Sequence, residues 1–142
     1  MKKTIVVLPM SEAIKFQSDE SWAAISIATD VGTNPTLSNK SRVGLLEMTF
    51  EDADFIRPNT PPEYIFDEIK AKKILDFVSE MWDKVDCFMI HCHAGMSRSP
   101  AVAAAIENIY YGNGADSRWF KEKTPNMRVY RTILNTHQSS LI

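Results

Sequence analysis

The sequence predicts a single α/β domain spanning residues 1–142, with a central, mostly parallel sheet of four to five strands flanked by helices. Three observations predict this class. Short apolar runs alternate with segments of helical periodicity, the pattern of a layered α/β fold. The run at 87–92 is apolar almost throughout, as in a strand buried on both faces. The length of 142 residues is that of one domain, since domains most often have roughly 100–150 residues.

The first half of the chain contains the patterns of three strands separated by loops. The candidate strands are residues 5–8, 23–28 and 43–50. Pro9 ends the first strand, and Ser11 is placed to cap a short helix over 12–17. The segment 30–42 has loop composition. The segment 51–62 is first acidic and then rich in proline, so it cannot continue a regular element.

The second half contains one more strand and several helices. Apolar residues recur at spacings of three and four from Glu63 to about Trp82, which predicts a long amphipathic helix. After the strand at 87–92, Pro100 suits the first turn of another helix, which Gly112 and Gly114 would end. The residues from 116 to 134 predict two short helices broken at Pro125.

Composition and charge exclude several classes of protein. Hydrophobic residues make up 44% of the chain, too many for a disordered protein. A formal net charge of -2 argues against a nucleic-acid binder, so any anion site must be local. No apolar run approaches the roughly 20 residues that span a bilayer. The N-terminal apolar run is too short for a signal peptide. We therefore predict neither a nucleic-acid nor a membrane partner.

The two cysteines predict a reducing environment. Cys87 and Cys92 lie in one predicted strand, where about 3.3 Å of rise per residue separates them by about 16 Å. A disulfide requires α-carbons within roughly 7 Å. Both thiols should therefore be free, which indicates a cytoplasmic protein.

The stretch from His91 to Pro100, His-Cys-His-Ala-Gly-Met-Ser-Arg-Ser-Pro, predicts a phosphate site. A short loop joins the predicted strand to the predicted helix, so loop amides and the helix N-terminus converge on one concavity. Gly95 permits the tight turn, and Arg98 has a planar fork that binds two phosphate oxygens. The same positive field stabilises the thiolate of Cys92, which can attack phosphorus and form a phosphocysteine.

This stretch resembles the signature loop of the cysteine-dependent protein tyrosine phosphatase superfamily, in which a Cys and an Arg are separated by five residues. The fuller pattern His-Cys-x-Ala-Gly-x-Ser-Arg-Ser looks most like the dual-specificity phosphatases. The resemblance implies the phosphotyrosine protein phosphatase fold and catalysis without metal or cofactor. It implies that Cys92 is the nucleophile, Arg98 binds phosphate, Ser99 assists thiolate departure and His91 is structural. The groups expected to bind substrate are the amides of His93, Ala94, Gly95, Met96, Ser97 and Arg98.

The family also uses an aspartate that protonates the leaving oxygen and then activates water. Asp52 and Asp54, in the acidic segment after the third strand, are the candidates. We prefer Asp52, because Phe50-Glu51-Asp52 resembles the Phe-x-Asp found at this loop in several small phosphatases. Asp54 remains the alternative.

Other interpretations of the same residues fit less well. A metal site would need more ligands than the pair of histidines around Cys92, because neighbouring strand side chains face opposite sides and His137 alone does not complete a site. A buried structural thiol would not require the adjacent glycine and arginine. A rhodanese-like sulfur transferase does not require an arginine six positions after its cysteine.

The sequence therefore predicts a protein phosphatase acting on phosphotyrosine, and on phosphoserine or phosphothreonine as a further candidate, in a protein or peptide. Action on a phosphoinositide or an RNA 5′-phosphate is an alternative. Lipid phosphatases of this superfamily tend to carry lysines in the loop, which has none here, and RNA-directed relatives tend to have Thr-Gly where this chain has Ser99-Pro100. A phosphate-binding pseudophosphatase is the third possibility. Oligomeric state is not indicated.

Overall fold

The computed structural model describes residues 3–112 and 117–141. Its centre is a four-stranded sheet in the order β1-β4-β2-β3, in which every neighbouring pair is parallel. The strands are β1 (Thr4–Pro9), β2 (Trp22–Ala28), β3 (Arg42–Thr49) and β4 (Cys87–Cys92). The predicted α/β class and parallel sheet are confirmed, with four strands.

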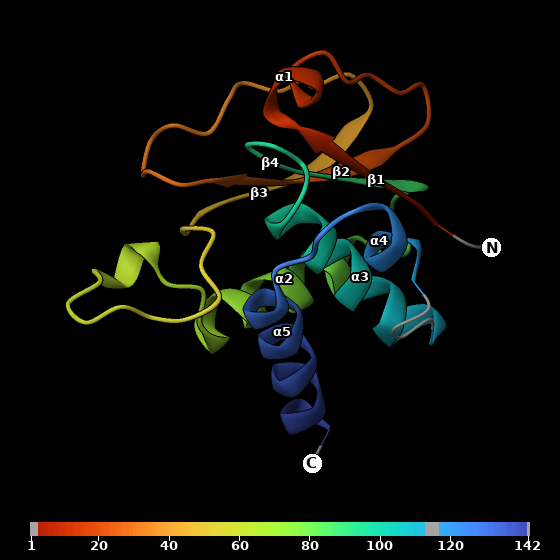
Figure 1. Cartoon of the computed structure of the whole chain (residues 1–142). Helices are drawn as coiled ribbons and strands as arrows, with labels where there is room; N and C mark the ends of the chain where they lie inside the picture. The colour runs from red at the N-terminus through yellow and green to blue at the C-terminus, as the bar shows by residue number, and fades with distance from the viewer. Residues whose placement is uncertain (1–2, 113–116, 142) are drawn as a thin grey trace.

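Helices cover the two faces of the sheet unequally, as Figure 1 shows. The helices are α1 (Met10–Ala13), α2 (Glu68–Met81), α3 (Arg98–Tyr111), α4 (Arg118–Glu122) and α5 (Met127–Ser140), with a 3-10 turn η1 (Pro62–Tyr64). The helices α2 to α5 gather on one face, whereas α1 and the connections around it lie over the other. The described residues contain no helix that is both long and apolar enough to cross a bilayer.

The alternation of side chains along the strands divides the core into two clusters. Phe88, Ile90 and Cys92 of β4 pack with the cluster that includes residues of α2, α3 and α5. Cys87 and Met89 belong to the second cluster, together with Ala13 of α1 and Trp22 of β2. Both faces of β4 are therefore buried, which explains why the run 87–92 lacks the polar alternation of a half-exposed strand.

Two helix starts differ from the prediction. The first helix begins at Met10 and ends at Ala13, and Pro9 rather than Ser11 occupies its N-cap, so the expected helix over 12–17 is wrong. The long helix begins at Glu68 rather than Glu63, because the Asp67 side chain accepts a hydrogen bond from the Lys70 amide and starts the helix there. The predicted helix was too long, because the spacing of apolar residues continues across a separate 3-10 turn.

The C-terminal half otherwise follows the predicted pattern, with one longer helix. Pro100 lies in the first turn of α3, and Gly112 ends that helix in a left-handed conformation. Gly114 lies outside the described residues. A break at Pro125 separates α4 from α5, but α5 is 14 residues long rather than short. The Asn126 side chain accepts a hydrogen bond from the Val129 amide and so begins α5.

Candidate active site

The loop that follows β4 lies at the carboxyl edge of the sheet, beside the end of β1. Pro9 of β1 pairs in register with Cys92, and the Met10 amide donates a hydrogen bond to the His93 carbonyl over 3.0 Å. Gly95 has a φ of +70°, and a Cβ there would lie 2.7 Å from the Pro9 nitrogen. Only glycine therefore lets the loop turn against the end of β1.

The thiol of Cys92 is nearly covered and has two polar neighbours. The Gly95 amide donates to Sγ over 3.2 Å, and Ser99 Oγ lies 3.1 Å from the same sulfur. Cys92 is 2% exposed and Ser99 is fully buried. A backbone N–H therefore donates a hydrogen bond to the sulfur, and a hydroxyl lies within hydrogen-bond distance of it.

The first turn of α3 leaves its amide groups available to an anion. Ser97 occupies the N-cap, yet its side chain does not cap the helix. Its hydroxyl donates instead to Asp52 Oδ1 over 2.8 Å. Because the first N–H groups of a helix have no partner within the helix, this end of α3 can bind the oxygens of a phosphoryl group beside Cys92.

Arg98 is buried and is held by neutral groups. Its Nη1 donates to the Phe50 carbonyl over 2.7 Å and to Thr29 Oγ1 over 2.9 Å. Among the described residues no carboxylate forms an ion pair with it. None of the described residues accepts a hydrogen bond from its Nε or Nη2 atom, so these donors can bind an external anion.

Asp52 reaches the loop from the segment that follows β3. Its Oδ1 accepts hydrogen bonds from Ser97 Oγ and from Asn126 Nδ2, each over 2.8 Å. Asn126 Nδ2 also donates to the Ala53 carbonyl over 3.1 Å, which fixes the segment itself. The Oδ2 atom accepts no hydrogen bond from the described residues. Asp54 instead lines a separate hollow with residues of α5 that include Arg128 and Arg131.

A buried polar network lies under the start of the loop. His91 Nε2 and Ser26 Oγ are 2.6 Å apart, and Asn34 Nδ2 donates to both oxygens of Ser26. The His91 Nδ1 atom lies 3.3 Å from the Cys92 carbonyl. Burial lowers the pKa of His91 below its usual range, against the raising effect of that backbone contact, and the positive charge of Arg98 lowers it further. The ring is therefore neutral and orients the backbone of Cys92.

The structure thus brings together the predicted Cys92, Arg98, Ser99 and Asp52, with the His93–Ser97 loop between them. Sequence reasoning missed four positioning side chains, namely Thr29, Asn126, Ser26 and Asn34. Each is a common polar residue in a connection or strand, and only the topology places it at the site. Only Asn126 could have been noticed in the sequence, because an Asn after Pro125 is typical of a helix N-cap.

The remaining predicted features concern Cys87 and metals. Both cysteines are free, as expected. Burial, chiefly, together with the charges of Glu20 and Asp86, raises the pKa of Cys87 to about 11, so this thiol stays protonated. Within residues 3–112 and 117–141, no group of three or more histidine, cysteine or acidic side chains could hold a metal ion.

Comparisons with known proteins place the chain by its fold. No protein-family model matches it, and no curated protein sequence does. The crystal structure of human tyrosine phosphatase-like serine/threonine/tyrosine-interacting protein matches with a TM-score of 0.68 at 15% identity, covering 97% of this chain and 93% of that one. PTPMT1 in complex with PI(5)P gives 0.59 at 14% identity, with 96% and 91% covered. Human DUSP28 gives 0.58 at 9% identity, with 99% and 95% covered.

Proposed function

The chain has the fold of the tyrosine and dual-specificity phosphatases, as the loop sequence led us to expect, and on this premise we propose that it is a cysteine-dependent phosphomonoester hydrolase. We propose phosphorylated proteins or peptides as its substrates, phosphotyrosine first. The observation that carries the proposal is the contact between Asp52 and Ser97, which holds a carboxylate beside the loop that contains Cys92 and Arg98. Two free thiols support a reducing, cytoplasmic setting.

In the first step the Cys92 thiolate attacks phosphorus while the phosphoryl oxygens bind the loop amides and Arg98. An S–P bond forms and the P–O ester bond breaks. Protonated Asp52 gives its proton to the leaving oxygen from Oδ2, the carboxylate oxygen that Ser97 and Asn126 leave free. The products are a phosphocysteine and the dephosphorylated alcohol.

In the second step the Asp52 carboxylate takes a proton from water, whose oxygen attacks the phosphocysteine. The S–P bond breaks and inorganic phosphate leaves. Ser99 Oγ, 3.1 Å from Sγ, donates a hydrogen bond to the departing thiolate. In the proposed reaction Arg98 and the loop amides bind the phosphoryl oxygens, Asp52 protonates the leaving oxygen and Ser99 stabilises the thiolate. The proposed reaction therefore requires no metal or cofactor.

Turnover of para-nitrophenyl phosphate tests this proposal. Cys92→Ser should abolish turnover while the protein still binds phosphate. Arg98→Lys should reduce turnover severely, since a point charge cannot reproduce the bidentate fork. Cys87→Ala is the matched control, because this second free cysteine of β4 lies at the far end of the strand. Activity should persist in chelator. Turnover by Cys92→Ser, or activity restored to chelated protein by a divalent ion, would contradict the mechanism.

A substrate panel then tests the substrate class. Phosphotyrosine, phosphoserine and phosphothreonine peptides should be hydrolysed better than phosphoinositide vesicles or an RNA 5′-phosphate, because the loop 93–97 lacks lysines that would meet extra phosphates. Preference for the lipid or the RNA would assign the other substrate. Phosphopeptide binding without turnover of any substrate would indicate a pseudophosphatase.

A further inference from the structure

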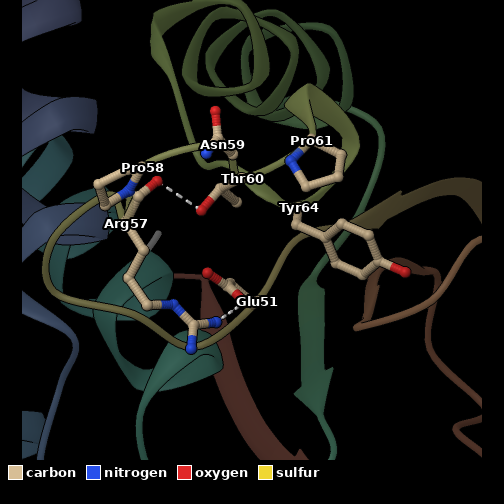
Figure 2. A pocket seen from close by; sticks show the side chains of 7 residues that line it. All are labelled: Glu51, Arg57, Pro58, Asn59, Thr60, Pro61 and Tyr64. Atoms are coloured by element: carbon tan, nitrogen blue, oxygen red, sulfur yellow. Dashed lines mark hydrogen bonds and ion pairs between the residues drawn. The ribbon is translucent and has the colours of Figure 1, made fainter.

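A hollow of about 410 Å³ lies in the segment that carries the candidate general acid. Glu51, the residue before Asp52, lies in its lining, as do Arg57, Pro58, Pro61 and Tyr64. Figure 2 shows Arg57 and Tyr64 on opposite sides of Glu51, with the prolines above. Asp52 accepts a hydrogen bond from Ser97 of the loop, and Glu51 is its neighbour in the chain, so the hollow belongs to the same segment that contacts the loop.

Internal hydrogen bonds hold the walls of the hollow in place. The Glu51 amide donates to the Tyr64 carbonyl over 2.8 Å, which joins the two ends of the proline-rich connection. Thr60 donates to the Arg57 carbonyl from Oγ1 over 2.7 Å and from its amide over 3.2 Å. Two prolines restrict the backbone further. The hollow is therefore formed before any ligand binds, which lowers the entropic cost of binding.

The carboxylates of Asp30, Glu51 and Glu63 lie near the Tyr64 side of the hollow, and the cations of Arg57 and Lys70 lie beside it. The Tyr64 hydroxyl donates a hydrogen bond to Asp30 over 3.0 Å. This hydrogen bond and the charge of Asp30 raise the pKa of Tyr64 most. Desolvation and the charges of Glu63 and Glu51 raise it further. Arg57 is the lining cation, and Glu51 neutralises it through an ion pair of 3.1 Å. The nearby Lys70 ammonium donates to backbone carbonyls of the η1 turn.

We propose that this hollow binds a lysine or arginine side chain of the phosphopeptide substrate, close to the phosphorylated residue. The prolines and the Tyr64 ring offer apolar and aromatic surface to the methylene stem and to the cation. The Asp30 carboxylate, which accepts the Tyr64 hydroxyl, attracts its charge, and Glu51, whose Oε2 pairs with Arg57, offers its Oε1 to the same cation. The inference rests on the proposed function and specifies the substrate class, namely phosphopeptides with a basic residue beside the phosphate.

The test compares phosphotyrosine peptides that carry Arg, Ala or Glu at each of the three positions on either side. At one position kcat/KM of the wild type should be about tenfold higher for Arg than for Glu, the size of one favourable charge and cation–π contact. Turnover of para-nitrophenyl phosphate should be the same for every variant, because that substrate carries no basic side chain to place in the hollow.

Two variants test the residues. Glu51→Gln frees Arg57 from its partner, so the preference should shift from Arg toward Glu. Tyr64→Leu keeps an apolar wall but removes the aromatic ring and the hydroxyl, so the preference for Arg should fall by a few fold. Glu80→Gln, which removes an exposed carboxylate on α2, is the control and should leave the preference unchanged.

A wild type without preference for Arg, or a preference that survives Glu51→Gln, would overturn the inference. A wild type that does not hydrolyse para-nitrophenyl phosphate would instead overturn the proposed function. In that case, anisotropy binding of the same labelled peptides still decides whether the hollow selects a basic side chain.

Discussion

Arg98 donates two hydrogen bonds from one nitrogen to uncharged oxygens of the chain. The Phe50 carbonyl belongs to the backbone, whereas Thr29 Oγ1 can be removed by mutation. A carboxylate in either place would have offset the positive charge that a phosphate needs. Neutral acceptors fix the direction of the guanidinium and leave its charge intact.

Thr29→Val should therefore misdirect Arg98 without removing it. Losing one hydrogen bond to a charged group costs about 1.5–3 kcal/mol, so we expect kcat/KM for para-nitrophenyl phosphate to fall about tenfold or more. The inhibition constants of phosphate and vanadate should rise in parallel, which a merely structural defect would not cause. Thr132→Val, on α5, removes a hydroxyl bonded within its own helix and is the control. An unchanged affinity for phosphate would show that the Phe50 carbonyl suffices.

The two aspartates after β3 have different surroundings, and this difference decides between them. Asp52 contacts Ser97 of the loop, whereas Asp54 lies in a hollow against α5. Asp52→Asn should lower kcat for phosphopeptides by about 10²–10⁴-fold, the usual cost of losing a general acid. It should also flatten the basic limb of the pH–rate profile.

Asp54→Asn should change kcat only mildly and should keep the basic limb. Measuring kcat at several pH values for both variants separates the assignments. If Asp54→Asn causes the large loss, the roles must be exchanged. If neither variant loses much activity, the general acid lies elsewhere in the chain.

At the scale of elements, the site is an assembly of three segments that are far apart in the sequence. The loop after β4, the segment after β3 and the link between α4 and α5 meet through hydrogen bonds of Asp52, Ser97 and Asn126. The loop was predictable, because its residues are contiguous and determine a strand, a turn and a helix start. Asn126 and Thr29 were not, because their roles depend on which connections the parallel topology brings to one edge.

Gly95→Ala tests how the loop rests on β1. A Cβ at this position would lie 2.9 Å from the Leu8 carbonyl carbon as well as close to Pro9, and the backbone has positive φ. Strain and clash together should cost about 1–3 kcal/mol or more and displace the Cys92 loop. Urea unfolding and aryl phosphate turnover measure both effects.

Gly32→Ala is the matched control, because Gly32 also has a positive φ, of +82°, but a Cβ there meets nothing within 4 Å. It should show the conformational cost without the clash and leave turnover unchanged. Equal losses of stability in both variants would mean that contact with β1 contributes nothing. Normal turnover by Gly95→Ala would show that the loop tolerates the displacement.

At the scale of the whole molecule, β4 lies between β1 and β2 and carries ionisable side chains into the core. Cys87 and His91 follow the same alternation as Met89, toward the face that α1 covers. The sequence predicted this buried strand, because a strand that is apolar on both faces is stable only where helices cover both sides of the sheet. It did not predict that Ser26 and Asn34 would satisfy the buried ring of His91.

These two groups should make the stability of the fold depend on pH at both ends. The folded-state pKa of His91 is lowered by burial, so its contribution to stability is present above the unfolded value near 6.5 and is lost as pH falls toward the folded value. For Cys87 the folded pKa is raised from 9.0 to about 11, so its contribution is present below 9.0 and is lost as pH rises to about 11.

Urea unfolding of the wild type between pH 5.5 and 10.5 should therefore show a plateau between about 6.5 and 9, as linkage requires. One group changes the free energy of unfolding by at most about 1.4 kcal/mol per pH unit. His91→Gln should be less stable at pH 7.5 but should lose less stability on acidification to 5.5, while His137→Gln, on α5, should behave as the wild type. Cys87→Ala should reduce the loss above pH 9. If His91→Gln loses as much stability on acidification as the wild type, protonation of His91 does not limit acid stability. The folded chain would then accept protonation of the His91 ring without loss of stability.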